Sequence, residues 1–184
     1  EEDVLQLRLI YKTITQEVPG LRLMLQTYFE AVERYDELIE LPVHGLGLDF
    51  VHGREGNLES LRRSGFPADK TLGAGLIDGR NIWRTDLDEA LNLLKVISLQ
   101  AGASEVIVQP SCSLLHVPVS VTREERLHPV LHDALAFAEQ KLEELVSLCK
   151  AAHGEGAEPV QFTENRRALA ALAADPARNL PFVR

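Results

Sequence analysis

Residues that could do chemistry gather directly behind the expected strands of this sequence. Four segments combine carboxylates, histidines, serines, arginines and the only tryptophan of the chain: residues 27–30, 49–53, 78–84 and 110–116. In parallel α/β folds, sites are built where the carboxyl ends of the strands meet. The pattern therefore predicts a site at this edge of a sheet. The alternative is structural, because loop residues must also satisfy buried backbone amides.

Two catalytic arrangements can be drawn from such residues, and neither fits its usual pattern. A nucleophilic triad could be taken from Ser111 or Ser113, His116 and Asp78. The Gly-x-Ser-x-Gly turn that exposes a nucleophilic serine is absent. His128 and His132 have the spacing of two metal ligands on one helical face, but no third ligand lies nearby in the sequence. We therefore predict no catalytic residue and no metal site in this chain.

Composition and charge exclude several classes of protein. The chain has 184 residues and a formal net charge of −9, from 19 Lys and Arg against 28 Asp and Glu. Nucleic acids and anionic membranes attract basic surfaces, so neither is an expected partner. No apolar run approaches the roughly 20 residues of a membrane-spanning helix. Two cysteines make no disulfide framework, so we expect a reduced, cytoplasmic protein. The acidic start without an initiator Met predicts a piece of a longer chain.

Apolar periodicity predicts alternating helices and strands. The expected strands are residues 21–27, 43–51, 71–77 and 105–109, and the expected helices are residues 3–16, 31–40, 58–63, 86–99, 131–152 and 164–174. Repeated βα units imply parallel strands with right-handed crossovers. The sequence thus predicts an α/β fold of four consecutive βα units. These could form a small open sheet or half of a (βα)8 TIM-type barrel.

Two of the expected helices carry specific signals. Thr85 and Asp88 stand at the spacing of a capping box, in which each side chain satisfies one free amide at the start of a helix. In the longest helix, seven residues recur every three or four positions and share one face: Leu131, Leu135, Ala138, Leu142, Leu145, Cys149 and Ala152. Glu143 and Glu144 fall on the opposite face. The pattern predicts one long amphipathic helix.

Three longer motifs resemble one enzyme family. They are residues 41–49 (LPVHGLGLD), 78–84 (DGRNIWR) and 110–118 (PSCSLLHVP), and residues 27–29 (TYF) and 135–142 (LAFAEQKL) extend the match. In this order and spacing they resemble cobalamin-independent methionine synthase, in the second half of the N-terminal domain of that family. The resemblance covers about residues 5–150 of this sequence.

The resemblance implies a fold and an activity for a parent enzyme. The family transfers a methyl group from 5-methyltetrahydrofolate polyglutamate to homocysteine, with zinc as the cofactor. Of its two facing βα barrels, the C-terminal one holds zinc, homocysteine and the reacting folate, and the N-terminal one helps to cover the cleft and contacts the polyglutamate tail. Zinc lowers the pKa of the homocysteine thiol, which then attacks as a thiolate. Residues 1–154 would be the C-terminal half of the N-terminal barrel. Residues 155–184 would be an inter-domain linker or extension with a short helix.

The sequence departs from the family's catalytic barrel at the zinc site. Cys112 follows a strand at the place where that barrel has a zinc-binding cysteine, but Asp49 and Asp78 at the other strand ends offer no His-x-Cys pair. One thiolate is a poor zinc site. The prediction is a fragment that holds no cofactor, covers the folate cleft and is inactive alone. The alternatives are a free-standing half-barrel that binds a small ligand or a protein, and a related barrel enzyme with another methyl or carboxyl substrate.

The resemblance makes four residues of one loop candidates for substrate binding: Arg80, Asn81, Trp83 and Arg84. They would face the inter-domain cleft, where Arg80 or Arg84 would hold the anionic folate tail. The alternative is structural. In that case Asp78, Arg80 and Asn81 hydrogen-bond within the loops, and Trp83 packs at the barrel mouth or a domain interface.

The expected partners are the other parts of the parent enzyme, with homocysteine and the folate as its substrates. A half-barrel also leaves two outer strands with unpaired amides and carbonyls, which invite pairing with another chain. The inner face of its apolar strands would meet water. We therefore predict a homodimer or larger assembly of the isolated chain.

Overall fold

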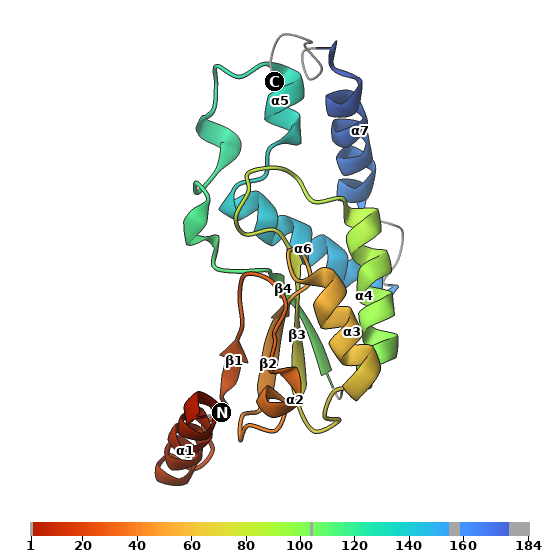
Figure 1. Ribbon diagram of the computed structural model, residues 1–184. Coiled ribbons are helices and arrows are strands. Elements are labelled where there is room, and N and C mark those ends of the chain that lie inside the picture. Colours follow the sequence, from red (N-terminus) through yellow and green to blue (C-terminus); the bar gives the residue numbers. More distant parts are fainter. Residues whose placement is uncertain (1, 104, 155–158, 177–184) are drawn as a thin grey trace. The chain divides into compact units, whose positions relative to one another are not determined.

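A four-stranded sheet lies at the centre of the first part of the chain in the computed structural model, which describes residues 2–103, 105–154 and 159–176 (Figure 1). The strands are β1 (Met24–Gln26), β2 (Gly45–Asp49), β3 (Thr71–Ile77) and β4 (Glu105–Pro110), and they lie side by side in that order. Parallel pairing sets Met24 opposite Gly45, and Gly45 opposite Thr71. The predicted α/β fold of four consecutive βα units is confirmed. The described sheet is open and is consistent with half of a barrel.

Helices alternate with these strands and then follow them. They are α1 (Glu2–Glu17), α2 (Tyr35–Leu38), α3 (Arg54–Ser64), α4 (Leu87–Ala101), α5 (Pro129–Ala134), α6 (Ala138–His153) and α7 (Val160–Ala174), with two 3₁₀ helices at Leu114–His116 and Val121–Arg123. The chain divides into two compact units. The first unit is Glu1–Leu76 with Leu94–Cys112, and the second is Ile77–Leu93 with Ser113–Arg184. The predicted domain boundary at residues 154 and 155 adjoins residues 155–158, which lie outside the described residues, and it stays a prediction.

Apolar side chains on one face of the sheet form the core of the first unit. Side chains alternate between the two faces along a strand, and one face carries five buried apolar residues: Leu46, Leu48, Leu72, Ala74 and Leu76. Helix α3 lies along this face (Figure 1). A separate cluster forms where α1 packs on the chain before β2, around Val4, Leu41 and Val43. Both clusters follow from apolar runs that were visible in the sequence.

The other face of the sheet is lined by glycines and amide side chains. Gln26 on β1 and Gln109 on β4 exchange two hydrogen bonds, of 3.2 and 2.8 Å, across the two strands between them. A Cβ atom on Gly47 would lie 1.8 Å from Gln26 Oε1, and one on Gly73 would lie 2.6 Å from Gln109 Oε1. Glycine at both positions therefore leaves room for the amide pair. The expected apolar inner face is wrong at these positions.

The outer strands still lead us to expect self-association of the isolated chain. Backbone groups on the free edges of β1 and β4 invite pairing, and Ile107 on β4 is 41% exposed. Light scattering at micromolar concentration should give at least twice the 20.4 kDa of one chain. Ile107→Lys, which places a charge on the outer strand, should shift the chain towards monomer. A monodisperse monomer that binds no hydrophobic dye would contradict this expectation.

The longest predicted helix is interrupted, which corrects the sequence interpretation. Residues 135–137 are extended and separate α5 from α6. The Ala136 amide donates to the Ile82 carbonyl (2.8 Å), and the Arg84 amide donates to the Ala134 carbonyl (2.9 Å). These bonds form an antiparallel bridge between Trp83 and Leu135. The backbone at the break is thus paired with a distant loop instead of with its own helix.

The buried face of α6 also differs from the predicted one. Leu142, which the pattern places on the apolar face, is 52% exposed. Lys141 and Glu144 are buried, at 0% and 5% exposure, although the pattern places Glu144 on the opposite face from the leucines. The helix is therefore rotated about its axis relative to the simple amphipathic arrangement.

The start of α4 is capped by a different residue from the one predicted. The Asp86 carboxylate accepts a hydrogen bond from the Glu89 amide (3.0 Å), so Asp86 is the cap residue. The Asp88 carboxylate is bound instead by the Arg166 guanidinium, through contacts of 2.6 and 2.7 Å. The predicted capping box of Thr85 and Asp88 is therefore wrong.

The helix predicted at residues 31–40 is shorter than expected and is found as α2, Tyr35–Leu38.

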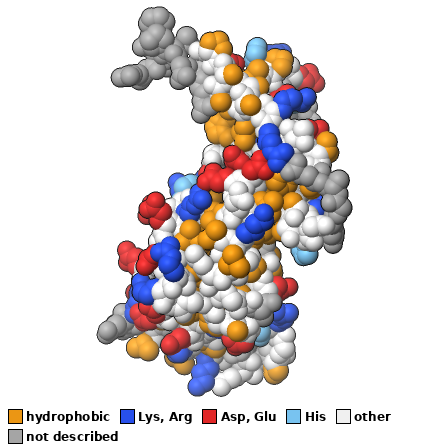
Figure 2. Space-filling model, turned by 90° about the vertical axis from the view of Figure 1, so that its right-hand side faces the viewer, with side chains coloured by type: hydrophobic (Ala, Val, Ile, Leu, Met, Phe, Trp, Pro, Cys, Tyr) orange, Lys and Arg blue, Asp and Glu red, His pale blue; other side chains and the backbone are white. Residues whose placement is uncertain are grey.

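The surface combines charged and apolar side chains. Figure 2 shows side chains of both signs interspersed with apolar ones on one face of the molecule. The apolar residues exposed on α4 include Val96 and Leu99.

A bilayer-spanning helix needs about 20 apolar residues, and no helix within the described ranges meets that requirement.

Candidate functional site

The loop after β3 carries the four predicted binding residues and is shaped by its own side chains. The Asp78 carboxylate accepts hydrogen bonds from the Arg80 amide (2.8 Å) and from Asn81 Nδ2 (2.5 Å). Asn81 Oδ1 then accepts from the Trp83 amide (3.0 Å). Such side-chain turns define the path of a loop without a helix or strand. These bonds are the ones that the structural interpretation expects, and the binding role of the four residues stays a prediction.

The four side chains differ in their exposure. Arg80, Asn81 and Trp83 are exposed, whereas Arg84 is half-buried. The Nε atom of Arg84 is buried and has no hydrogen-bond partner within the described parts of the chain. Trp83 is 41% exposed, so its truncation should cost less than the roughly 3–5 kcal/mol of a fully buried aromatic residue. Arg80 is therefore the better placed of the two arginines to meet an anion from solvent.

Two charged residues of α6 bind the main chain of this loop. Lys141 Nζ donates to the Trp83 carbonyl (3.1 Å). The Thr85 amide donates to Glu144 Oε1 (3.2 Å). Of the two, Glu144 was predicted to lie on the exposed face of its helix, and it is buried instead. The burial of both residues is explained by the loop, because a buried charge must be compensated by hydrogen bonds or an opposite charge.

Helix α7 adds a neutral polar contact to the same stretch of chain. Asn165 Nδ2 donates to the Thr85 carbonyl (2.8 Å), and Asn165 Oδ1 accepts from the Leu87 amide (3.4 Å). Asn165 is buried. One asparagine thus bridges the end of the loop to the first turn of α4. The segment from Trp83 to Leu87 is held by residues that follow it by more than fifty positions.

Burial dominates the electrostatics of Glu144. It raises the pKa of this carboxyl from 4.5 to about 7, against the lowering effects of Lys141, Thr85 and Arg84. Glu144 Oε2 and Thr85 Oγ1 are buried and have no hydrogen-bond partner among the described residues. The carboxyl therefore changes its charge near neutral pH, inside the structure.

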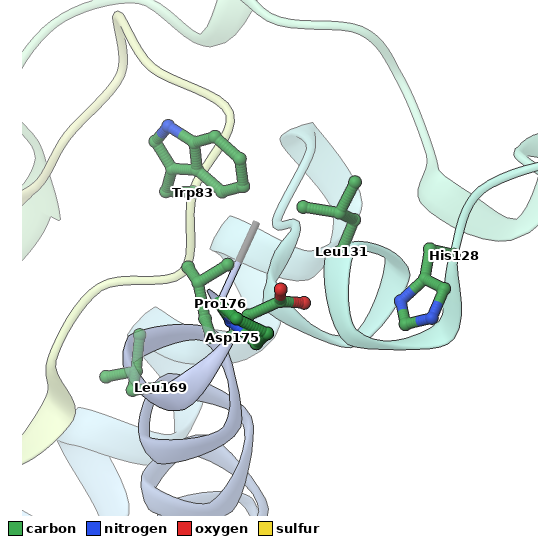
Figure 3. Close-up of a pocket in the computed structure, with 7 residues that line it drawn as sticks. Trp83, His128, Leu131, Leu169, Asp175 and Pro176 are labelled. Carbon is green, nitrogen blue, oxygen red and sulfur yellow. The ribbon is translucent and has the colours of Figure 1, made fainter. Parts of the chain in front are cut away.

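A cavity of about 970 Å³ adjoins the loop within the second unit. Figure 3 shows Trp83 from the loop, His128 and Leu131 at α5, and Leu169 on α7 around it. Leu172, Asp175 and Pro176 also line it. The described part of its lining is largely apolar and includes one carboxylate and one imidazole. His132, the second histidine of the predicted pair, has its Nδ1 3.8 Å from the Asp133 carboxylate.

The strand ends of the first unit form a second polar region. The segments 27–30 and 49–53 meet there, because a Cβ on Gly53 would lie 2.4 Å from the carbonyl of Glu30. Asp49 is buried, and its Oδ1 accepts from the amides of Val51 (2.8 Å) and His52 (2.9 Å). Its Oδ2 lies 3.4 Å from His52 Nδ1. Asp49 thus shapes the turn after β2.

Zinc, which the resemblance implies for the parent enzyme, does not fit the described residues of this chain. Cys112 is buried at the end of the first unit. No group of three or more His, Cys, Asp or Glu side chains could hold a metal ion within the described residues.

Sequence reasoning missed Lys141, Glu144 and Asn165 as residues of the site. A signal existed for the first two, because charged residues three positions apart share one side of a helix. That signal is ordinary for a solvated face. Only the loop backbone that they bind distinguishes them.

Known proteins resemble this chain closely. Residues 1–102 match the family described as cobalamin-independent synthase, N-terminal domain. A 5-methyltetrahydropteroyltriglutamate–homocysteine methyltransferase of Bacillus cereus (strain G9842) is 58% identical over 147 residues, which are 79% of this chain and 19% of that relative. Relatives of the same name in Bacillus thuringiensis (strain Al Hakam) and Bacillus anthracis (strain A0248) are each 55% identical over 161 residues, 87% of this chain and 21% of theirs.

The chain spans about a fifth of the length of these curated relatives. The matched family covers more than half of the chain, in the part that holds β1 to β3. The family predicted from the three sequence motifs is thereby confirmed. The chain belongs to the cobalamin-independent methionine synthase family, within its N-terminal domain.

Proposed function

We propose that this chain is the part of a methionine-forming methyltransferase that covers the folate cleft, and that it transfers no methyl group alone. The supporting observation is its 55–58% identity to methyltransferases named for 5-methyltetrahydropteroyltriglutamate and homocysteine. The chain spans about a fifth of those proteins, and in this proposal the zinc and the reacting groups lie in the rest of them. Zinc supplies a thiolate nucleophile there by lowering the pKa of the homocysteine thiol.

Within this function, the loop after β3 contacts the anionic glutamate tail of the folate. Arg80 offers an exposed guanidinium and Trp83 an exposed aromatic surface in the same loop, while Asn81 Nδ2 already donates to Asp78. A guanidinium binds carboxylates with paired, charge-assisted hydrogen bonds. Arg84 is half-buried and contributes less to this contact.

We predict that the purified chain yields no methionine from methylated triglutamyl folate and homocysteine. The reason is that the described residues hold no group that fits zinc. Mass spectrometry of the reaction mixture, with added zinc, measures the product. The full-length Bacillus cereus relative, assayed in parallel, is the positive control. Zinc-dependent methionine above background from this chain alone would refute the structural role.

Arg80→Ala should weaken binding of a triglutamyl folate by about tenfold, the usual effect of losing one charge-assisted contact. Quenching of the emission of Trp83, the only tryptophan, measures the affinity. Arg62→Ala is the control, because Arg62 is an exposed arginine of α3 that pairs with Glu59. The monoglutamyl folate should be bound equally by both variants. Equal triglutamyl affinities for both variants would remove Arg80 from the site.

The second candidate, a free-standing module that binds a small ligand, is favoured by the cavity beside Trp83. Its volume of about 970 Å³ is near the upper end of typical ligand pockets. The length of the natural reading frame separates the two functions. A frame several times longer, with a His-x-Cys pair and a later cysteine beyond residue 184, supports the methyltransferase. A frame that ends at Arg184 supports the module.

A further inference from the structure

The orientation of α6 is unfavourable for simple packing. Leu142 and Val146 are more than half exposed, while Lys141 and Glu144 on the same helix are buried. Removing two charges from water is costly, and apolar residues in their place often leave stability unchanged or improve it. A helix selected only for packing would carry Leu142 and Val146 inward, as it carries Leu148. Another requirement must therefore set the rotation of α6.

The loop backbone supplies that requirement. Lys141 donates to the Trp83 carbonyl, and Glu144 accepts from the Thr85 amide, so the two charges flank Arg84 along the chain. Both hydrogen bonds go to main-chain atoms. The loop side chains that point outward, Arg80 and Trp83, are left exposed by this arrangement.

We propose that Lys141 and Glu144 are positioning residues, which hold the main chain of residues 83–85 so that the exposed side chains of the loop stay in a binding geometry. The inference rests on the proposed function for what the loop binds, but the positioning can be measured without any ligand. The two charges act as one unit. A donor alone would fix only the carbonyl side of Arg84, and an acceptor alone only the amide side.

The decisive variant removes both charges together and keeps the volume, as Lys141→Met with Glu144→Leu. Global stability should be unchanged or higher, since a buried charged pair gives way to apolar contacts. The Thr85 amide should exchange with solvent about tenfold faster, the effect of losing one hydrogen bond to a charged group. The emission of Trp83 should become more accessible to acrylamide. This division between a stable fold and a loosened loop is not expected for residues that only support the fold.

Control variants isolate the effect of the pair. Lys150→Met and Glu143→Gln change exposed residues of the same helix and should leave the Thr85 amide and Trp83 emission unchanged. Glu144→Leu alone should expose the Thr85 amide, and Glu144→Gln, which keeps an acceptor, should restore most of the protection that Glu144→Leu removes. If the double variant does not fold, this pair of single variants decides the question.

Two results would overturn the proposal. One is unchanged exchange and quenching in the double variant, and the other is a parallel loss of stability and loop order. Binding of triglutamyl folate is measured separately on the same variants. A loop that loosens in a chain with no affinity for the folate would refute the proposed function and leave the positioning role intact.

Discussion

Replacing Gly75 with alanine should destabilise the first unit by about 2–4 kcal/mol, at the upper end of overpacking effects. An added Cβ would lie 2.8 Å from the Leu48 carbonyl oxygen and 2.9 Å from Ser111 Cα. Both are main-chain atoms of segments that lie beside β3, so no side-chain rotation can relieve the clash. Since whole domains are stable by only about 5–15 kcal/mol, the urea midpoint should fall clearly at an unchanged slope.

A second glycine provides the control for this substitution. Gly154, which ends α6, lies in the left-handed region with a φ of +66° and a ψ of 26°, and has no atom within 4 Å of an added Cβ. Gly154→Ala should therefore cost only about 1 kcal/mol, from the backbone conformation alone. If the two substitutions lower the urea midpoint equally, close approach of main chains at Gly75 is not what requires glycine there.

Glu144 should make the free energy of unfolding fall as the pH rises from about 4.5 to about 7. Burial raises the pKa of this carboxyl to about 7 in the folded chain, from the ordinary 4.5. The folded state then binds the proton more tightly than the unfolded state. This contribution is complete below about 4.5 and is lost as the pH rises through the folded pKa. The loss is on the order of 3 kcal/mol.

Glu144→Gln should abolish this slope, because the amide does not titrate. Urea unfolding at a series of pH values measures it, and Glu143→Gln, on the exposed side of α6, should retain it. Glu37 and Asp88 have the opposite effect on the pH dependence of the free energy of unfolding. Hydrogen bonds from Arg34 and Arg166 lower their pKa values, so their contribution is lost only on acidification below the ordinary range. A slope that persists in Glu144→Gln would show that this carboxyl is not its source.

The elements predicted best are those whose signals lie within their own residues. The third strand was predicted at 71–77 and is found there as β3, because an apolar run bounded by turn residues is a local signal. Helix α1 was likewise predicted within a residue at each end. The loop after β3 was also predicted from the sequence as a candidate site. Both of its signals, a place directly behind a strand and the motif of residues 78–84, lie within a short stretch of chain. The hydrogen bonds that the Asp78 and Asn81 side chains accept within it span only two or three positions.

By itself, the sequence determined the fold class, the family and the loop that carries the candidate site. Tertiary structure decided which side of α6 is buried, where the long helix breaks and which residues hold the loop. Lys141 is 58 residues from its partner Trp83, and Glu144 is 59 residues from Thr85. Helical periodicity depends on a dozen neighbouring residues and favours a buried leucine stripe. Whether a lysine and a glutamate can be buried instead depends on main-chain partners that a distant segment brings to them, and only the folded chain supplies those.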